Sequence, residues 1–73
     1  MKLQINEKGS WRNMVEFPDD REKMMDVGDA AAVLGKAVGG KATFRMLDAT
    51  GEVLGYLEPP LYAEWRSPHQ VQS

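Results

Sequence analysis

The sequence has no cysteine and a single histidine, His69. The lack of cysteine excludes disulfide bonds and thiolate metal sites. His69 lies in a polar stretch without a base or nucleophile to pair with, which excludes a histidine-centred catalytic site. No stretch approaches the roughly 20 apolar residues of a membrane-spanning helix, and the first residues lack the pattern of a signal peptide. We therefore expect a cytoplasmic protein that makes no membrane contact.

Chain length and charge set two further limits. The 73 residues suffice for one core, because chains of this size bury only about 60% of the surface that they expose when unfolded. We expect a single domain over residues 1–66 and a disordered tail over residues 67–73. Nine basic residues stand against eleven acidic ones, a formal charge of -2. That sign disfavours a protein whose affinity comes from neutralising nucleic-acid phosphates.

The N-terminal residues alternate between apolar and polar, the period of a strand with one buried face. Leu3 and Ile5 are the apolar members of the first strand, and residues 7–10 supply turn chemistry before a second strand over residues 11–17. The side chains expected to point inward from the second strand are Trp11, Val15 and Phe17. Those expected on the opposite face are Arg12, Met14 and Glu16. This pattern predicts a β-hairpin.

The apolar period then lengthens to that of a helix. The residues at this spacing are Val27, Ala30, Ala31, Leu34, Ala37 and Val38. The glycines at 39–40 supply a left-handed stop at the C-terminal end. Two starting points are open. Asp26 or Asp29 can cap a helix that begins at this stripe; residues 19–22 have the spacing of an earlier capping box, although Gly28 weakens one continuous helix.

Strand-like alternation returns after the helix and predicts a second hairpin. It covers residues 41–47, a tight loop over residues 48–51, and a partner strand over residues 52–58. The side of this hairpin expected to face inward includes Ala42, Phe44 and Met46. The predicted fold is α+β: a small ββαββ domain with a four-stranded, largely antiparallel sheet, one helix packed on one face, and a C-terminal arm.

The last predicted strand is apolar on both sides, with Val53 and Leu57 on one side and Leu54 and Tyr56 on the other. A strand of this kind is usually buried on both faces, so we expect a cover over the outer face of the sheet. The candidates are a docked arm formed by residues 59–65, a second copy of the chain, and a foreign partner.

Three short stretches of the sequence are candidates for chemistry. Residues 35–42 differ from a phosphate-binding loop by Ala42, where a hydroxyl is required, and they follow a predicted helix instead of preceding one. Residues 59–62 read Pro-Pro-x-Tyr, the ligand pattern of WW domains, or a strand terminator followed by the arm. The acidic residues between 19 and 29 match no calcium loop and suit a helix start. The sequence predicts no enzyme, catalytic residue, metal site, cofactor or small-molecule substrate.

The outer face of the sheet is the predicted binding surface. With the aromatic side chains assigned inward, the residues left outside are Lys2, Gln4, Arg12, Met14, Thr43, Arg45 and Leu47. We expect binding through Lys2, Arg12, Met14, Arg45 and Leu47, since arginine and methionine are enriched at protein interfaces. The predicted function is a non-enzymatic protein-binding or adaptor module, with self-association into a homodimer as one form. The alternative is a nucleic-acid accessory protein that uses Lys2, Arg12, Lys41 and Arg45, although that surface would lack aromatic rings for base stacking.

Overall fold

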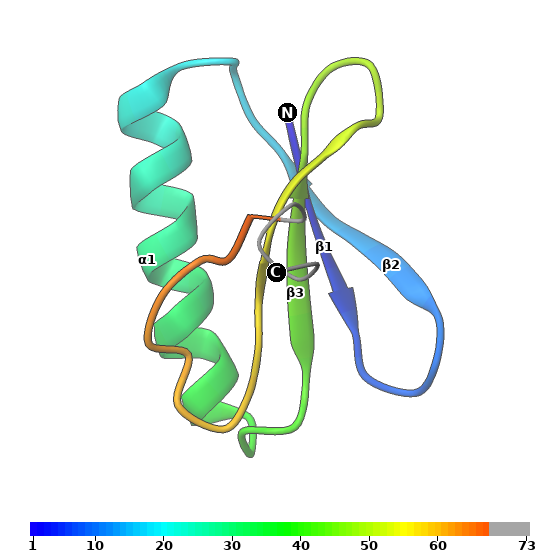
Figure 1. Ribbon diagram of the computed structural model, residues 1–73, viewed down its shortest axis with the longest axis vertical. Coiled ribbons are helices and arrows are strands. Elements are labelled where there is room, and N and C mark those ends of the chain that lie inside the picture. The colour runs from blue at the N-terminus through cyan, green and yellow to red at the C-terminus, as the bar shows by residue number, and fades with distance from the viewer. Residues whose placement is uncertain (68–73) are drawn as a thin grey trace.

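The computed structural model describes residues 1–67, in which one helix lies across a sheet of four strands (Figure 1). The elements in chain order are β1 (Lys2–Asn6), β2 (Trp11–Glu16), α1 (Arg21–Ala37), β3 (Thr43–Leu47) and β4 (Val53–Leu57). The sheet is antiparallel throughout, in the order β2-β1-β3-β4. The predicted α+β class and the ββαββ element order are confirmed.

Two sequence predictions concern the C-terminal tail and contact with a membrane. The predicted tail lies outside the described residues apart from Ser67, and so does His69. Within residues 1–67, no helix combines the length and the apolar character that crossing a membrane requires.

The core lies between α1 and the face of the sheet that the helix covers. Leu3 and Ile5 of β1 pair with Met46 and Phe44 of β3, and residues directly opposite each other share a face. Phe44 is 0% exposed, and Ala42 and Met46 are also buried. The predicted inward side of the second hairpin is therefore confirmed at these three residues. Each large apolar side chain buried in this way contributes about 1.5–3 kcal/mol to stability.

Helix α1 begins before the apolar stripe because Asp20 caps it. The Asp20 backbone is extended, and its carboxylate accepts a hydrogen bond of 2.8 Å from the Glu22 backbone N–H. The earlier of the two predicted starts is correct, with the cap one residue after Asp19. Asp26 and Asp29 lie inside the helix. Loss of such a cap typically costs about 1 kcal/mol.

The buried face of α1 is made of small residues, Gly28, Ala31 and Gly35. Of the predicted stripe, the buried or partly buried members are Val27, Ala31 and Leu34. The exposed members are Ala30, Ala37 and Val38. The stripe is therefore wrong at three positions, because the packing face is centred on glycines that an apolar pattern does not count.

The C-terminal arm, residues 59–66, packs beside α1 and supplies the bulk that the helix lacks. Tyr62 is 3% exposed, and its hydroxyl donates a 2.6 Å hydrogen bond to the Ala42 carbonyl. Its ring meets that of Phe44 edge-on, with centroids 6.0 Å apart. A β-carbon on Gly35 would lie only 2.6 Å from the Tyr62 ring. Burial raises the pKa of the Tyr62 phenol above its ordinary value and takes the ring out of reach of a WW domain.

Trp65 lies on a second glycine of the same helix face. Its Nε1 donates a 3.3 Å hydrogen bond to the Gly28 carbonyl, and a β-carbon on Gly28 would lie 2.8 Å from that nitrogen. The next residue, Arg66, exchanges two backbone hydrogen bonds with Tyr56. The predicted docking of the arm is confirmed. Its predicted position is wrong, because the arm, orange in Figure 1, lies between α1 and β4 and not over the outer face of the sheet.

Candidate binding surface on the outer sheet face

A β-bulge in the first hairpin decides which side chains of β2 face outward. Leu3 pairs with Val15. The next residue, Gln4, pairs with Asn13, which makes Met14 an extra residue between the two pairs. Side chains alternate with a period of two along a strand. An extra residue therefore reverses which side chains face outward in the part of β2 that precedes the bulge, residues 11–13.

The reversal places Trp11 on the outer face of the sheet. Trp11 pairs with Asn6, whereas Arg12 pairs with the core residue Ile5 and so belongs to the helix side. The predicted inward position of Trp11 and outward position of Arg12 are both wrong, since the pattern of one strand does not show where its partner requires a bulge. Arg12 remains exposed, because β2 is an edge strand whose residues from Arg12 to Glu16 are all exposed.

The second hairpin contains a bulge of the same kind in β4. Gly55 and Val53 pair with consecutive residues of β3, which makes Leu54 the extra residue. Val53 and Tyr56 therefore face outward, and Leu57 faces the core. The prediction that Val53 shares a side with Leu57 is wrong. The apolar character on both sides of this strand comes from the bulge and does not require an additional cover.

Side chains from three strands meet on the outer face, and we call them the aromatic cluster: Trp11, Arg45 and Tyr56. The guanidinium carbon of Arg45 lies 4.2 Å from the Trp11 ring centre, within the range of a cation–π interaction. The Trp11 and Tyr56 ring centroids are 6.3 Å apart. Arg45 Nε donates a 2.7 Å hydrogen bond to Gln4 Oε1, and Gln4 Nε2 donates to Asn13 Oδ1 at 2.6 Å. Contacts from all four strands thus hold the cluster.

Arg45 keeps hydrogen-bonding capacity within this cluster. Its Nε is bonded to Gln4, and its carbon lies over Trp11. Within residues 1–67, no group accepts a hydrogen bond from its two terminal nitrogens. An oriented guanidinium with free donors is complementary to a carboxylate, which it can bind through two parallel hydrogen bonds.

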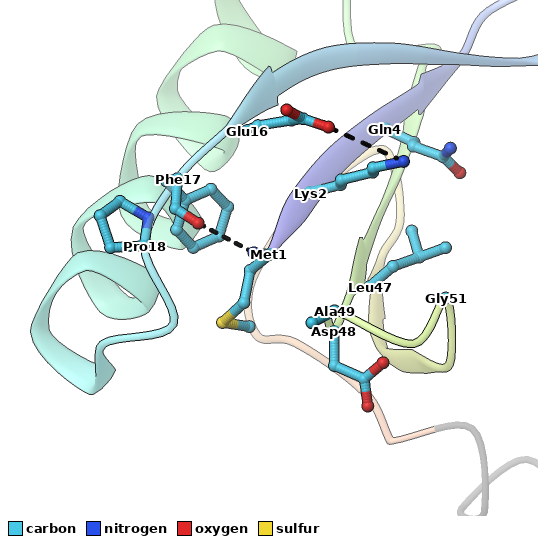
Figure 2. A pocket seen from close by; sticks show the side chains of 10 residues that line it. All are labelled: Met1, Lys2, Gln4, Glu16, Phe17, Pro18, Leu47, Asp48, Ala49 and Gly51. Atoms are coloured by element: carbon cyan, nitrogen blue, oxygen red, sulfur yellow. Dashed lines mark hydrogen bonds and ion pairs between the residues drawn. The ribbon is translucent and has the colours of Figure 1, made fainter.

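A hollow of about 500 Å³ lies where β1 begins (Figure 2). Gln4 lines it and connects it to Arg45. Leu47 forms an apolar wall and is only 8% exposed. Lys2 and Glu16 lie at the hollow with Nζ and Oε1 3.8 Å apart, an exposed ion pair that adds little stability. The hollow offers room for one partner side chain, and Gln4 links it to the guanidinium of Arg45, which is not itself a lining residue.

Asp48, which also lines this hollow, is engaged in the turn after β3. Its carboxylate accepts hydrogen bonds from the Thr50 hydroxyl and from the backbone N–H groups of Thr50 and Glu52. The hydroxyl bond from Thr50, with the backbone bonds, holds the pKa of Asp48 below its ordinary value. Asp48 therefore stays ionised and stabilises the turn.

The five residues predicted to bind a partner do not form one site. Lys2 and Leu47 line the hollow, and Arg45 belongs to the aromatic cluster. Arg12 belongs to the opposite side, and Met14 lies in the bulge, 41% exposed. The predicted exposure of Leu47 is wrong. Direct participation of these residues in binding stays a prediction.

Two aromatic residues of this surface, Trp11 and Tyr56, were not predicted to face outward. The sequence did contain one signal for Tyr56: the apolar character of residues 53–57 on both sides, which a bulge explains. We find no corresponding signal for Trp11, because the first strand pair alternates regularly in the sequence.

Comparisons with protein-family models, with curated protein sequences and with solved structures gave no match to this chain. Within residues 1–67, no three His, Asp or Glu side chains lie close enough together to hold a metal ion.

Proposed function

We propose that this chain is a non-enzymatic binding module that docks a partner protein on the outer face of its sheet. The aromatic cluster of Trp11, Arg45 and Tyr56 carries the proposal. Tryptophan, tyrosine and arginine are the residue types that dominate binding energy at protein interfaces. Because neighbouring side chains already hold the three residues in place, docking orders few additional groups, which favours affinity.

The partner in this proposal presents a carboxylate to Arg45 and an apolar side chain to the hollow where β1 begins. The terminal nitrogens of Arg45 support the first contact, and the apolar wall at Leu47 supports the second. Lys2 adds no net positive charge to the hollow, because Glu16 and Asp48 also line it. The partner surface in this proposal therefore presents one carboxylate, for Arg45, beside an apolar anchor.

Charge reversal at the two arginines of the sheet tests the proposal. Arg45→Glu and Arg12→Glu make the same change on opposite faces, and Arg12 is exposed. We expect Arg45→Glu and Trp11→Ala to weaken binding of a partner isolated with the wild-type chain by at least about tenfold, as for hot-spot residues. Arg12→Glu should bind like the wild type. Equal losses of binding affinity for both arginine variants would show that binding does not depend on the outer face, which contradicts the proposal.

A second candidate function is binding of single-stranded nucleic acid. Its support is that Trp11 and Tyr56 face outward beside Arg45, since bases stack on exposed aromatic rings. The predicted basic patch is nevertheless divided, because Lys2 lies near a carboxylate and Arg12 belongs to the other face. Titration with a random single-stranded oligonucleotide at low ionic strength separates the two functions. Tight binding that falls steeply with salt favours nucleic acid, and no binding removes it.

A further inference from the structure

A second hollow of about 500 Å³ lies on the other side of the sheet, and we call it the methionine groove. Its lining includes Met24 and Met25 from α1, Met46 from β3, Leu54 from β4, Trp65 from the arm, and Asp29. Three of the five methionines in the chain are thus gathered here. Methionine side chains are flexible and polarizable, and they adapt to apolar groups of varied shape.

The groove is open to solvent at its apolar wall. Met25 is 58% exposed and Leu54 is 41% exposed. Gly28 and Gly55, one on α1 and one on β4, lie beneath Trp65, and the indole packs against the backbone where their side chains would be. Exposed apolar side chains around a hollow are typical of a binding surface.

Charge selects the occupant of this groove. Among the described lining residues, Asp29 is the one charged side chain. Residues 19–29, the stretch to which it belongs, carry five carboxylates against the two basic side chains of Arg21 and Lys23. The carboxylates are Asp19, Asp20, Glu22, Asp26 and Asp29. An occupant with both an apolar and a cationic side chain is complementary to the apolar wall of the groove and to the carboxylate at its edge.

We infer that the methionine groove binds a basic segment of a partner protein. An apolar side chain of that segment enters between Met25, Leu54 and Trp65, and a neighbouring lysine or arginine faces Asp29. The volume lies within the range of about 300–1,000 Å³ found for ligand pockets, which suits one or two large side chains. This inference does not rest on the proposed function, since the groove and the aromatic cluster lie on opposite sides of the sheet.

The two tryptophans allow each surface to be observed separately. Trp65 borders the groove, Trp11 belongs to the aromatic cluster, and the chain has two tryptophans in all. A synthetic lysine–leucine peptide titrated into the isotope-labelled full chain is followed by the two indole N–H signals in NMR spectra. We expect the Trp65 signal to shift with added peptide and the Trp11 signal to stay. A shift at Trp11 alone, or at neither, would overturn the inference. A shift at neither leaves docking at the outer face unaffected, whereas a shift at Trp11 alone would also count against a carboxylate-bearing partner there.

Two control peptides separate the apolar and the charged contributions. A lysine–serine peptide keeps the charge without the apolar side chains, and a glutamate–leucine peptide keeps the apolar side chains with the opposite charge. Each should bind at least about tenfold more weakly than the lysine–leucine peptide. Equal binding of the first indicates unspecific attraction, and equal binding of the second indicates a site without charge selection; either result contradicts the inference.

A matched pair of helix variants completes the test. Met25 and Val33 are both exposed apolar residues of α1, 58% and 70% exposed, and Met25 alone of the two lines the groove. Met25→Lys should weaken the lysine–leucine peptide by about tenfold through lost apolar contact and added repulsion, whereas Val33→Lys should have no effect. Equal effects of the two variants would overturn the inference. A shift of the Trp65 signal on concentrating the chain without peptide would also overturn it, because that shift would assign the groove to a second copy of the chain.

Discussion

The two tryptophans of the chain lie on opposite sides of one sheet, and their surroundings differ in kind. Trp65 rests on the backbone of Gly28 and donates a hydrogen bond to it, so its contacts join the arm to the helix. Trp11 lies over the side chain of Arg45, whose terminal nitrogens are bonded to no group within residues 1–67. Both rings are partly buried. Exposure alone therefore does not distinguish an aromatic residue that joins two elements of the fold from one that lies beside a charged group with free hydrogen-bond donors.

The helix side needs the arm because α1 offers little bulk to the core. Its buried residues are Gly28, Ala31 and Gly35. Tyr62 and Trp65 fill the space above the two glycines, which are seven residues apart and therefore on one face of the helix. A core of this size rarely supplies more than about 3–5 kcal/mol, so these two aromatic residues account for a large share of the stability.

Replacing Tyr62 should have the largest effect of any change on the helix side. Tyr62→Ala removes a buried ring and its hydrogen bond to Ala42, at a cost of about 3–5 kcal/mol. That equals the stability expected of the whole domain, so circular dichroism should show a largely unfolded chain. Leu61→Ala is the control, because Leu61 is 71% exposed. A Tyr62→Ala variant that unfolds as cooperatively as the wild type would show that packing of the arm does not stabilise the domain.

A methyl group on Gly35 should have the next largest effect. Alanine normally stabilises a helix interior relative to glycine by about 1 kcal/mol. At position 35 its β-carbon would lie 2.6 Å from the Tyr62 ring, so we expect Gly35→Ala to destabilise the domain by about 1–3 kcal/mol. Gly28→Ala should be milder, since it meets one edge of the Trp65 side chain. Urea unfolding measures both; a higher midpoint for Gly35→Ala would contradict the packing described here.

The contribution of the Tyr62 hydroxyl to the stability of the helix side should depend on pH. Tyr62→Phe leaves the Ala42 carbonyl without this hydrogen bond and should cost about 1–2 kcal/mol at neutral pH. Burial raises the folded-state pKa of Tyr62 above its ordinary 10.0. The contribution of the protonated phenol is therefore complete below the unfolded-state pKa and is lost as pH rises through the folded-state pKa. Urea unfolding from about pH 8 to about pH 11 should show a smaller alkaline decline for Tyr62→Phe than for the wild type.

The fold was largely predictable because its main signals are local. Alternation identified the inward residues Phe44 and Met46, and the loop over residues 48–51 follows from the hydrogen bonds that Asp48 makes to its neighbours. The glycines of α1 were harder to interpret. By helix propensity alone, Gly28 weakens the helix. Gly28 and Gly35 are seven residues apart, however, and together they leave space on one helix face for the large aromatic side chains of the arm.

The candidate site was less predictable because it depends on strand register. The bulges at Met14 and Leu54 reverse the alternation of two strands, and a bulge is set by pairing with another strand, not by local composition. Trp11 was therefore assigned to the core, although it lies outside with Arg45. The acidic residues near the start of α1 fit a helix start, but the methionine groove beside Asp29 depends on the packing of α1, β3, β4 and the arm, which the sequence does not show.

The comparison of the two tryptophans can be tested directly by the free energy of unfolding in urea of Trp65→Ala and Trp11→Ala. Trp65→Ala should lose about 3 kcal/mol, because it removes a side chain on which the arm and α1 pack. Trp11→Ala should lose about 1 kcal/mol, the size of an aromatic pair with a cation–π contact at a partly exposed site. Equal losses, or a larger loss for Trp11→Ala, would contradict the assignment of Trp65 to the contact between the arm and the helix and of Trp11 to the outer surface of the sheet.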